Sequence, residues 1–220
     1  MYPWITHTWN PIRGKCPHDC SYCYMKRIPN VGELRFVEKE MNTNLGKGNT
    51  IFVGSSTDMW AEIKELIEIF NREEVINHCH SYKNNFYVFQ TKNPNMYSLY
   101  LSLLENLHNC CKGILLGTTI ETNKEFLSIS KAPETYLRMV HMVRISLPKF
   151  VSIEPIMDFD LEIMIGWIRK IKPEFVSIGA DSGHNSLPEP PAWKVKKLIE
   201  ELKQFTEVKL KSNLKRLLED

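Results

Sequence analysis

The stretch Ile114-Leu115-Leu116-Gly117-Thr118-Thr119-Ile120 (residues 114–120) is apolar over most of its length and contains several β-branched residues. An apolar run of this length, without alternating polar residues, is typical of a strand that is buried on both faces. Similar runs recur along the chain, and the last of them is more polar than the others. They cover residues 5–9, 51–56, 86–91, 150–154, 175–179 and 208–211. The pattern predicts a parallel sheet, because parallel sheets are covered on both faces.

Stretches with the spacing of amphipathic helices lie between these runs, and most begin with a capping residue or a proline. The predicted starts are Asp58, Asn93-Pro94, the capping box Thr122-Asn123-Lys124-Glu125, Asp160 and Pro190-Pro191. The helix after Asp58 is expected to run through Ile63, Ile67 and Phe70. Six or seven β-α units in 220 residues predict an α/β fold: a partial or near-complete (β/α) barrel of six to seven parallel strands, or an open doubly wound sheet.

The composition is that of an ordinary soluble protein, with 43% hydrophobic residues, 25% charged residues and a net charge of +2. A chain of 220 residues fits a single domain, residues 1–220. The small net charge gives no global indication of a nucleic-acid or membrane partner. The N terminus lacks the pattern of a signal peptide, and no apolar run is long enough to cross a bilayer. We therefore expect a cytoplasmic protein with no membrane partner.

Polar or small residues close most of the predicted strands. Both candidate architectures bind ligands at the carboxyl ends of parallel strands, so we expect these residues to be neighbours in space. The set comprises Asn10, Ser55, Ser56, Thr91, Thr119, Glu121, Glu154 and Gly179. For Glu154 we favour a functional role, because a carboxylate that ends a buried strand needs a partner or a ligand. Further candidates, for the substrate side of such a site, are Lys92, Asp181, Lys211 and Asn213.

Three of the six cysteines form a C-x3-C-x2-C motif, Cys16, Cys20 and Cys23, directly after the first predicted strand. In a reducing compartment such spacing indicates metal or redox chemistry in preference to disulfide bonds. Three thiolates on one short loop can bind one face of a [4Fe–4S] cluster. The fourth iron then stays open to a small molecule, which is a catalytic arrangement.

Two other metal sites are compatible with the same cysteines. A structural zinc site would need a fourth ligand, either His18 or a distant residue. A cluster used only for electron transfer would need a fourth cysteine, from among Cys79, Cys110 and Cys111. We interpret those three as buried small residues, because they fall within or at the end of predicted helices.

The motif C-x3-C-x-aromatic-C after the first strand resembles the signature of the radical SAM superfamily, with Tyr22 in the aromatic position. Other stretches resemble one group within it, the phage-associated radical-SAM-like proteins of unassigned function, which are distant relatives of the spore photoproduct lyases. These stretches are residues 8–12, 55–60, 90–94, 117–121, 152–155 and 178–183. The resemblance extends over nearly the whole chain.

The resemblance implies that Cys16, Cys20 and Cys23 hold a [4Fe–4S] cluster whose open iron binds S-adenosylmethionine. These cofactors would supply a 5′-deoxyadenosyl radical that takes a hydrogen atom from the substrate. An external one-electron donor is implied as a partner. The substrate is not identified, with nucleotides and nucleic acids among the candidates, and the oligomeric state is left open. The alternative function is a non-catalytic iron–sulfur or zinc module that recognises a partner or a nucleic acid.

The resemblance also implies roles for side chains at the strand ends. Tyr22 would pack near the adenine, and Gly179 would let the adenine approach the backbone. Ser55 and Ser56 stand where the superfamily has a glycine-rich motif, and their hydroxyls would accept hydrogen bonds from the methionine amine. The other expected contacts are Glu121 to the ribose or the amine, Arg138 to the methionine carboxylate and Glu154 to a ligand or partner. For Arg138, a solvated position on a helix is an equally good interpretation.

Overall fold

The computed structural model describes residues 2–61, 72–125 and 128–219. Within these residues one parallel sheet contains β1 (His7–Trp9), β4 (Thr50–Val53), β5 (Phe86–Thr91), β6 (Ile114–Thr119), β7 (Lys149–Ile153), β8 (Phe175–Ile178) and β9 (Glu207–Leu210). The strand order is β1-β4-β5-β6-β7-β8-β9, and every neighbouring pair is parallel. The prediction of an α/β fold with a parallel sheet of six to seven strands is confirmed, including its polar last strand.

The described helices alternate with these strands. They are α1 (Arg72–Ser81), α2 (Asn95–Leu99), α3 (Leu101–Cys110), α4 (Thr135–Arg144), α5 (Leu161–Ile171), α6 (Ala192–Leu202) and α7 (Lys215–Leu218), with the 3-10 turns η1 (Tyr24–Arg27), η2 (Glu38–Asn42) and η3 (Ser212–Leu214). A small two-stranded antiparallel sheet, formed by β2 (Ile12–Arg13) and β3 (Arg35–Phe36), is separate from the parallel sheet. No helix in the described parts of the chain combines the length and the apolar composition that a bilayer crossing requires.

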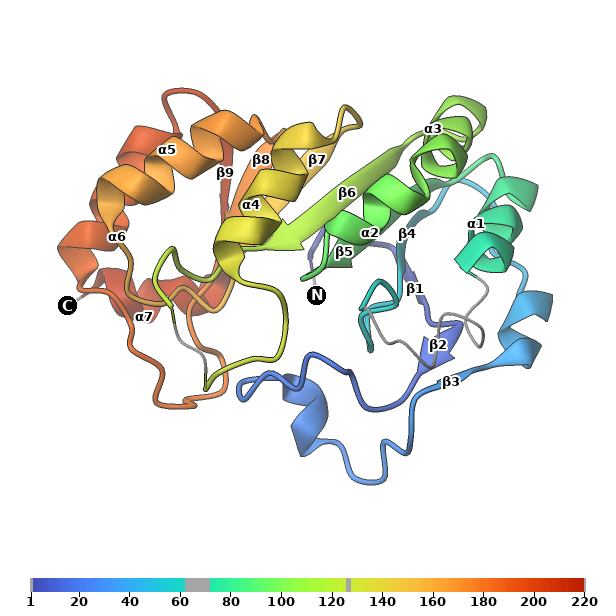
Figure 1. Cartoon of the computed structure of the whole chain (residues 1–220), viewed down its shortest axis with the longest axis horizontal. Helices are drawn as coiled ribbons and strands as arrows, with labels where there is room; N and C mark the ends of the chain where they lie inside the picture. The colour runs from blue at the N-terminus through green and yellow to red at the C-terminus, as the bar shows by residue number, and fades with distance from the viewer. Residues whose placement is uncertain (1, 62–71, 126–127, 220) are drawn as a thin grey trace.

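The helices cover one face of the sheet, as the arc formed by α1, α3, α4, α5 and α6 in Figure 1 shows. Leu116 and Val151 belong to the large core that the strands share with these helices. Their strand neighbours Leu115 and Phe150 point to the opposite face and join a separate cluster. Because the strand order runs in one direction and does not reverse, the doubly wound alternative is excluded.

The N-terminal residues fill the face of the sheet that the helices leave open. The Tyr2 ring stacks on Trp4 with the ring centroids 5.2 Å apart and meets the Phe150 ring edge-on at 5.6 Å. Trp4 packs edge-on against Phe175 at 5.6 Å. The Tyr2 hydroxyl donates a hydrogen bond to Gln90 Oε1 at 2.9 Å. These aromatic rings form an apolar floor on this face of the sheet.

One predicted helix start is wrong. Thr122 opens no helix in the described residues, and the next helix, α4, begins at Thr135. The Thr122 hydroxyl donates to the carbonyl of Asp158 at 2.6 Å and accepts the backbone N–H of Lys124 at 3.0 Å. Threonine side chains bond to nearby backbone in turns as well as at helix caps, and here the turn prevails.

The other predicted starts have different outcomes. The helices expected after Asp160 and Pro191 are confirmed as α5 and α6. The helix expected at Asn93-Pro94 begins at Asn95, with Pro94 in place of Asn93 at the N-cap position. The helix expected through Ile63, Ile67 and Phe70 falls on residues 62–71, which lie outside the described residues.

Gly117 is a point of close packing between the two central strands. The parallel register pairs Gly117 on β6 with Phe150 on β7, and both are fully buried. A Cβ atom at residue 117 would overlap the Phe150 ring. The absence of a side chain at Gly117 therefore provides the space in which the Phe150 ring lies.

We expect Gly117→Ala to lower the free energy of unfolding by about 1–3 kcal/mol, because the added methyl displaces Phe150 from a packed cluster. The matched control is Gly166→Ala in α5, where a Cβ would meet nothing within 4 Å. That change should raise the free energy of unfolding by up to about 1 kcal/mol, because alanine favours helix. Urea unfolding of both variants measures the two effects, and a loss of equal size at both positions would contradict this account.

Candidate functional site

A cavity of about 550 Å³ lies at the carboxyl ends of the strands, a volume that suits a small-molecule ligand. Tyr2 and Phe52 contribute its floor, and the cysteine motif contributes one wall. Among the strand-end residues expected to be neighbours, those that line it are Ser55, Ser56, Thr91, Thr119 and Glu154. Among the candidates for the substrate side, those that line it are Lys92, Asp181 and Lys211. Asn213 lies elsewhere, in a separate hollow near the C terminus.

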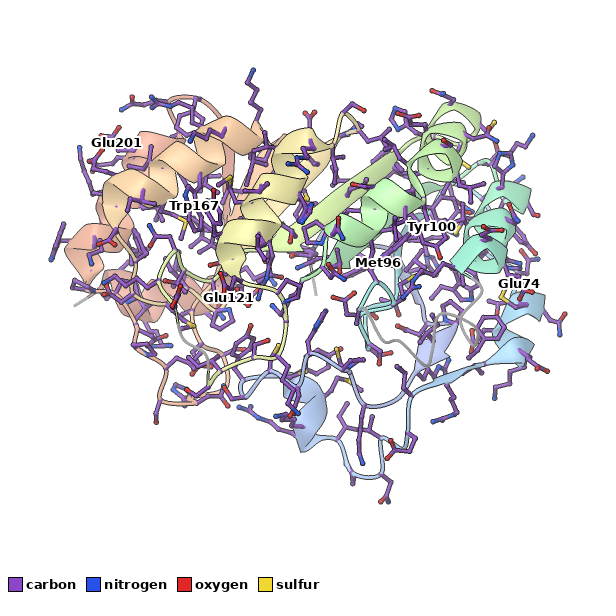
Figure 2. The ribbon with its side chains drawn as sticks, viewed as in Figure 1. Glu74, Met96, Tyr100, Glu121, Trp167 and Glu201 are labelled. Atoms are coloured by element: carbon purple, nitrogen blue, oxygen red, sulfur yellow. The ribbon has the colours of Figure 1, made fainter. Side chains whose placement is uncertain are left out.

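A second, smaller cavity of about 150 Å³ adjoins the first. Tyr22 lines both cavities and so separates them. Glu121 and Arg138 line only the smaller one. Figure 2 shows Glu121 beside the end of α4 that faces the loops, with Trp167 of the same small cavity on α5. Six of the seven expected cofactor-binding residues thus line one or both of two neighbouring cavities, whereas Gly179 lines neither.

Cys16, Cys20 and Cys23 all line the larger cavity, and all three are free thiols. Cys20 is buried, whereas Cys16 and Cys23 are half-buried. The cysteines outside the motif lie away from this cavity. Cys79 is buried in α1 and Cys111, at the end of α3, has its sulfur 3.9 Å from the Cys79 carbonyl oxygen.

The arrangement of these thiols distinguishes between kinds of metal site. Among the described residues, no three His, Cys, Asp or Glu side chains approach closely enough to share a single metal ion. A [4Fe–4S] cluster makes a different demand, because each cysteine binds a different iron and the sulfurs stand apart around the cube. Three free thiols that line one cavity match such a cluster in number, whereas a closed four-ligand zinc site would need a further ligand.

Burial raises the pKa of the Cys16 thiol to about 12, and the negative charge of Asp58 acts in the same direction. Backbone N–H groups of Asp58 and His18 oppose this shift. Metal ligation requires a thiolate, so iron would have to displace the Cys16 proton. A cation at this position would offset the charge that burial otherwise disfavours.

His18, between the first two cysteines, anchors the motif to the end of β4. Its Nε2 atom lies 2.9 Å from Asp58 Oδ2, and both side chains are nearly inaccessible to solvent. The same carboxylate oxygen accepts the Thr91 hydroxyl at 2.9 Å and the backbone N–H of Lys92 at 2.8 Å. Burial alone would raise the pKa of Asp58, but the His18 charge and these hydrogen bonds outweigh it and lower the pKa. His18 is therefore fixed in orientation by Asp58 through its Nε2 atom.

Tyr22, between the second and third cysteines, anchors the motif to the end of β6. Its hydroxyl donates a short hydrogen bond to Glu121 Oε1. The other carboxylate oxygen of Glu121 pairs with Arg138 Nη1 at 2.8 Å. Arg138 also donates to the carbonyl oxygens of Thr119 at 3.0 Å and Pro133 at 2.6 Å. Arg138 is thus buried at 3% exposure and bound to Glu121, so the solvated alternative for this residue is wrong.

Lys92, at the end of β5, connects the two anchors. Its backbone N–H binds Asp58, and its side-chain Nζ atom lies 2.7 Å from Glu121 Oε1. The same ammonium group stands 5.3 Å from the centre of the Tyr22 ring. Burial alone would raise the pKa of Glu121, but the charges of Arg138 and Lys92 outweigh it and lower the pKa to about 2. Glu121 is therefore a buried carboxylate held ionised by two cations.

Asn10, at the end of β1, organises the two serines that line the larger cavity. Its Oδ1 atom accepts the hydroxyls of Ser55 and Ser56, each at 3.1 Å, and the backbone N–H of Ser56 at 3.0 Å. Both hydroxyl protons are consequently directed to Asn10. The serine oxygens keep their lone pairs, so toward the cavity they present acceptors, which suit a ligand that donates hydrogen bonds.

Glu154 and Lys211 form an ion pair across the ends of β7 and β9 inside the larger cavity. The Lys211 ammonium also stands 4.4 Å from the centre of the Tyr2 ring in the floor. A Cβ at Gly179 would lie 2.9 Å from the Glu154 carboxyl carbon. The glycine at residue 179 therefore leaves room for Glu154, and the expectation that Glu154 has a partner at the strand ends is met by Lys211.

Sequence reasoning missed several residues that shape this site. The sequence suggests His18 only as a metal ligand and Asp58 only as a helix cap, yet together they form a buried pair. Ser130, whose hydroxyl lies 3.0 Å from the Cys20 sulfur, carries no sequence signal because it is 110 residues away along the chain. A His between two closely spaced cysteines is the sequence signal that could have suggested an anchoring role.

We expect Glu121→Gln to lower the free energy of unfolding at neutral pH by about 3–5 kcal/mol, because two buried cations lose their counter-ion. The contribution of ionised Glu121 to the free energy of unfolding is fully present above its usual pKa of 4.5, and it is lost as the pH falls toward about 2. The difference between wild type and variant should therefore shrink between neutral pH and about pH 3, as urea unfolding would show. Glu33→Gln, in an exposed pair with Lys15, is the control and should change nothing measurable.

Comparison with known proteins places the chain in a family. None of the curated proteins matches it. A family model described as "Protein of unknown function (DUF5131)" matches residues 2–208, which is nearly the whole chain and includes the cysteine motif and every residue of the larger cavity except Lys211. The chain belongs to this family, DUF5131, whose description assigns no function.

Proposed function

We propose that this chain is a radical-SAM-type enzyme in which Cys16, Cys20 and Cys23 hold a [4Fe–4S] cluster and the larger cavity takes S-adenosylmethionine. The observation that carries the proposal is that three free thiols of one short loop line a cavity of about 550 Å³ together with polar side chains from the strand ends. When bound, the two cofactors would supply radical chemistry that removes a hydrogen atom from a substrate.

The fold supports this proposal in its finer form, a partial (β/α) barrel. The strands follow one another in sequence order, and the helices lie on one face, as on the outside of a barrel. Within the described residues β1 and β9 are the two edges of the sheet and do not pair with each other. A partial barrel of this kind places its ligand at the carboxyl ends of the strands, where the cavity lies.

The chain contributes binding, orientation and exclusion of water. His18 and Tyr22 hold the cysteine motif on two buried carboxylates, so its shape does not depend on the metal alone. Ser55 and Ser56 present acceptor oxygens that suit the amine of an amino-acid ligand. The floor of Tyr2 and Phe52 shields the base of the cavity from water.

We propose roles for Arg138 and Glu121 that differ from the ones that the resemblance implies. Arg138 is bound to Glu121 and to two carbonyl oxygens, which leaves it poorly placed to receive a methionine carboxylate. Lys92 and Lys211 line the larger cavity, where they pair with the carboxylates of Glu121 and Glu154 respectively. We therefore propose that Glu121 and Arg138 support Tyr22, and that the lysines face the ligand.

The proposed radical chemistry also sets requirements for partners and for location. Radical chemistry of this kind needs an external one-electron donor and, to keep the thiols reduced, a compartment such as the cytoplasm. The substrate class stays open, with nucleotides and nucleic acids among the candidates. The alternative function, a non-catalytic iron–sulfur or zinc module, makes the same use of the cysteines but does not consume S-adenosylmethionine.

We expect the chain, reconstituted anaerobically with iron and sulfide, to take up about four irons and, after reduction, to show the electron paramagnetic resonance signal of a [4Fe–4S] cluster. Adding S-adenosylmethionine should change the shape of that signal, because it would bind the open iron. Cys23→Ala should lose the cluster, whereas Cys110→Ala, a cysteine at the end of α3, should keep it.

Three results would contradict the proposal. Uptake of stoichiometric zinc without iron would indicate a structural site. A cluster that survives in Cys23→Ala would place the ligands elsewhere. A signal that S-adenosylmethionine does not change, with none of it cleaved under reducing conditions, would favour the non-catalytic module.

A further inference from the structure

The chain segment after β6 lies directly against the cysteine motif. The backbone N–H of Ser21 donates to the carbonyl oxygen of Ile129 at 2.8 Å, and that of Lys131 donates to the carbonyl oxygen of His18 at 2.7 Å. These two hydrogen bonds hold residues 129–131 beside the loop that carries Cys20. The side chain of Ser130 is thereby placed next to the Cys20 sulfur.

The Ser130 hydroxyl approaches this sulfur from outside the larger cavity. Its Oγ atom lies 3.0 Å from Cys20 Sγ and 3.2 Å from the His18 carbonyl oxygen, and it accepts the backbone N–H of Ala132 at 3.1 Å. Ser130 lines the smaller cavity, whereas Cys20 lines the larger one. Iron bound from the larger cavity would therefore leave the contact between Ser130 and Cys20 in place.

The hydroxyl has a single proton and two acceptors within reach. While Cys20 is a thiol, its S–H can donate to Ser130 Oγ, and the Ser130 proton is free to bind the His18 carbonyl. When Cys20 becomes a thiolate it has no proton, so only Ser130 can donate in that contact. The His18 carbonyl keeps the N–H of Lys131 at 2.7 Å, so the turn of the hydroxyl leaves no carbonyl unpaired.

We propose that Ser130 is a positioning residue for Cys20, whose hydroxyl turns from the His18 carbonyl to the sulfur when the sulfur binds iron, and so stabilises the reduced cluster. The inference rests on the proposed function, because only a bound cluster has a reduction potential to adjust. Hydrogen bonds to ligand sulfurs are among the determinants of that potential, since they offset the negative charge added on reduction. Removing the donor should therefore make the cluster harder to reduce.

The reduction potential of the reconstituted cluster tests this role. We expect Ser130→Ala to lower the equilibrium constant for one-electron reduction roughly tenfold, which is about 59 mV. Ser130→Thr, which keeps the hydroxyl, should restore the wild-type value. Ser128→Ala, an exposed serine of the same segment, should leave the potential unchanged. A complete cluster in Ser130→Ala with the wild-type potential would overturn the proposal.

The infrared S–H stretching band of the metal-free protein gives a readout that needs no cluster. The Cys20 band, assigned by its disappearance in Cys20→Ala, should move to higher frequency in Ser130→Ala because the thiol loses its acceptor, and should return toward wild type in Ser130→Thr. A band that does not move would overturn the contact itself. If the wild-type chain takes up no cluster, the proposed function fails, and the role of Ser130 in the reduction potential fails with it. A shift of the Cys20 S–H band in Ser130→Ala would still establish the contact between the two side chains.

Discussion

Two buried carboxylates at the strand ends determine the geometry of the whole site. Asp58 binds His18 and Glu121 binds Tyr22, so the cysteine motif is attached at two points to the sheet beneath it. Lys92 joins the two carboxylates through its backbone N–H and its ammonium group. A buried carboxylate is tolerated only when its charge is balanced and its hydrogen-bonding capacity is satisfied. His18, Tyr22 and Lys92 meet this requirement for Asp58 and Glu121.

The attachment makes the cysteine motif part of the folded core before any metal is considered. In small metal-binding loops the metal often organises the ligands and contributes the folding free energy. Here Cys20 is buried, and the backbone of residues 129–131 binds the motif from a distant part of the chain. A preorganised three-thiol loop suits a proposed site that must keep one iron open, because the protein and not the cofactor then sets the shape of the opening.

The one-sided arrangement of the helices explains why a cavity exists at this end of the sheet. Residues on one face of each strand pack against the helices, while those on the other face meet the rings of Tyr2 and Trp4. The Tyr2 ring lies beneath the carboxyl ends of the strands, where its hydroxyl donates to Gln90, the residue before the last of β5. The ion pair of Lys211 and Glu154 lies above this floor, so polar side chains of the cavity directly adjoin the apolar rings.

The sequence alone predicts the parallel sheet, its strands and the loop that carries the cysteines, because strand burial and the motif depend on residues that are close together in the chain. It also indicated that Ser55, Thr119 and Glu154 share one edge, since parallel strands bring their carboxyl ends together. The contacts of Arg138 with Glu121 and of Ser130 with Cys20 become visible only in the folded chain. Such pairs join side chains from distant segments, and their geometry is set by how the loops pack, which no local pattern records.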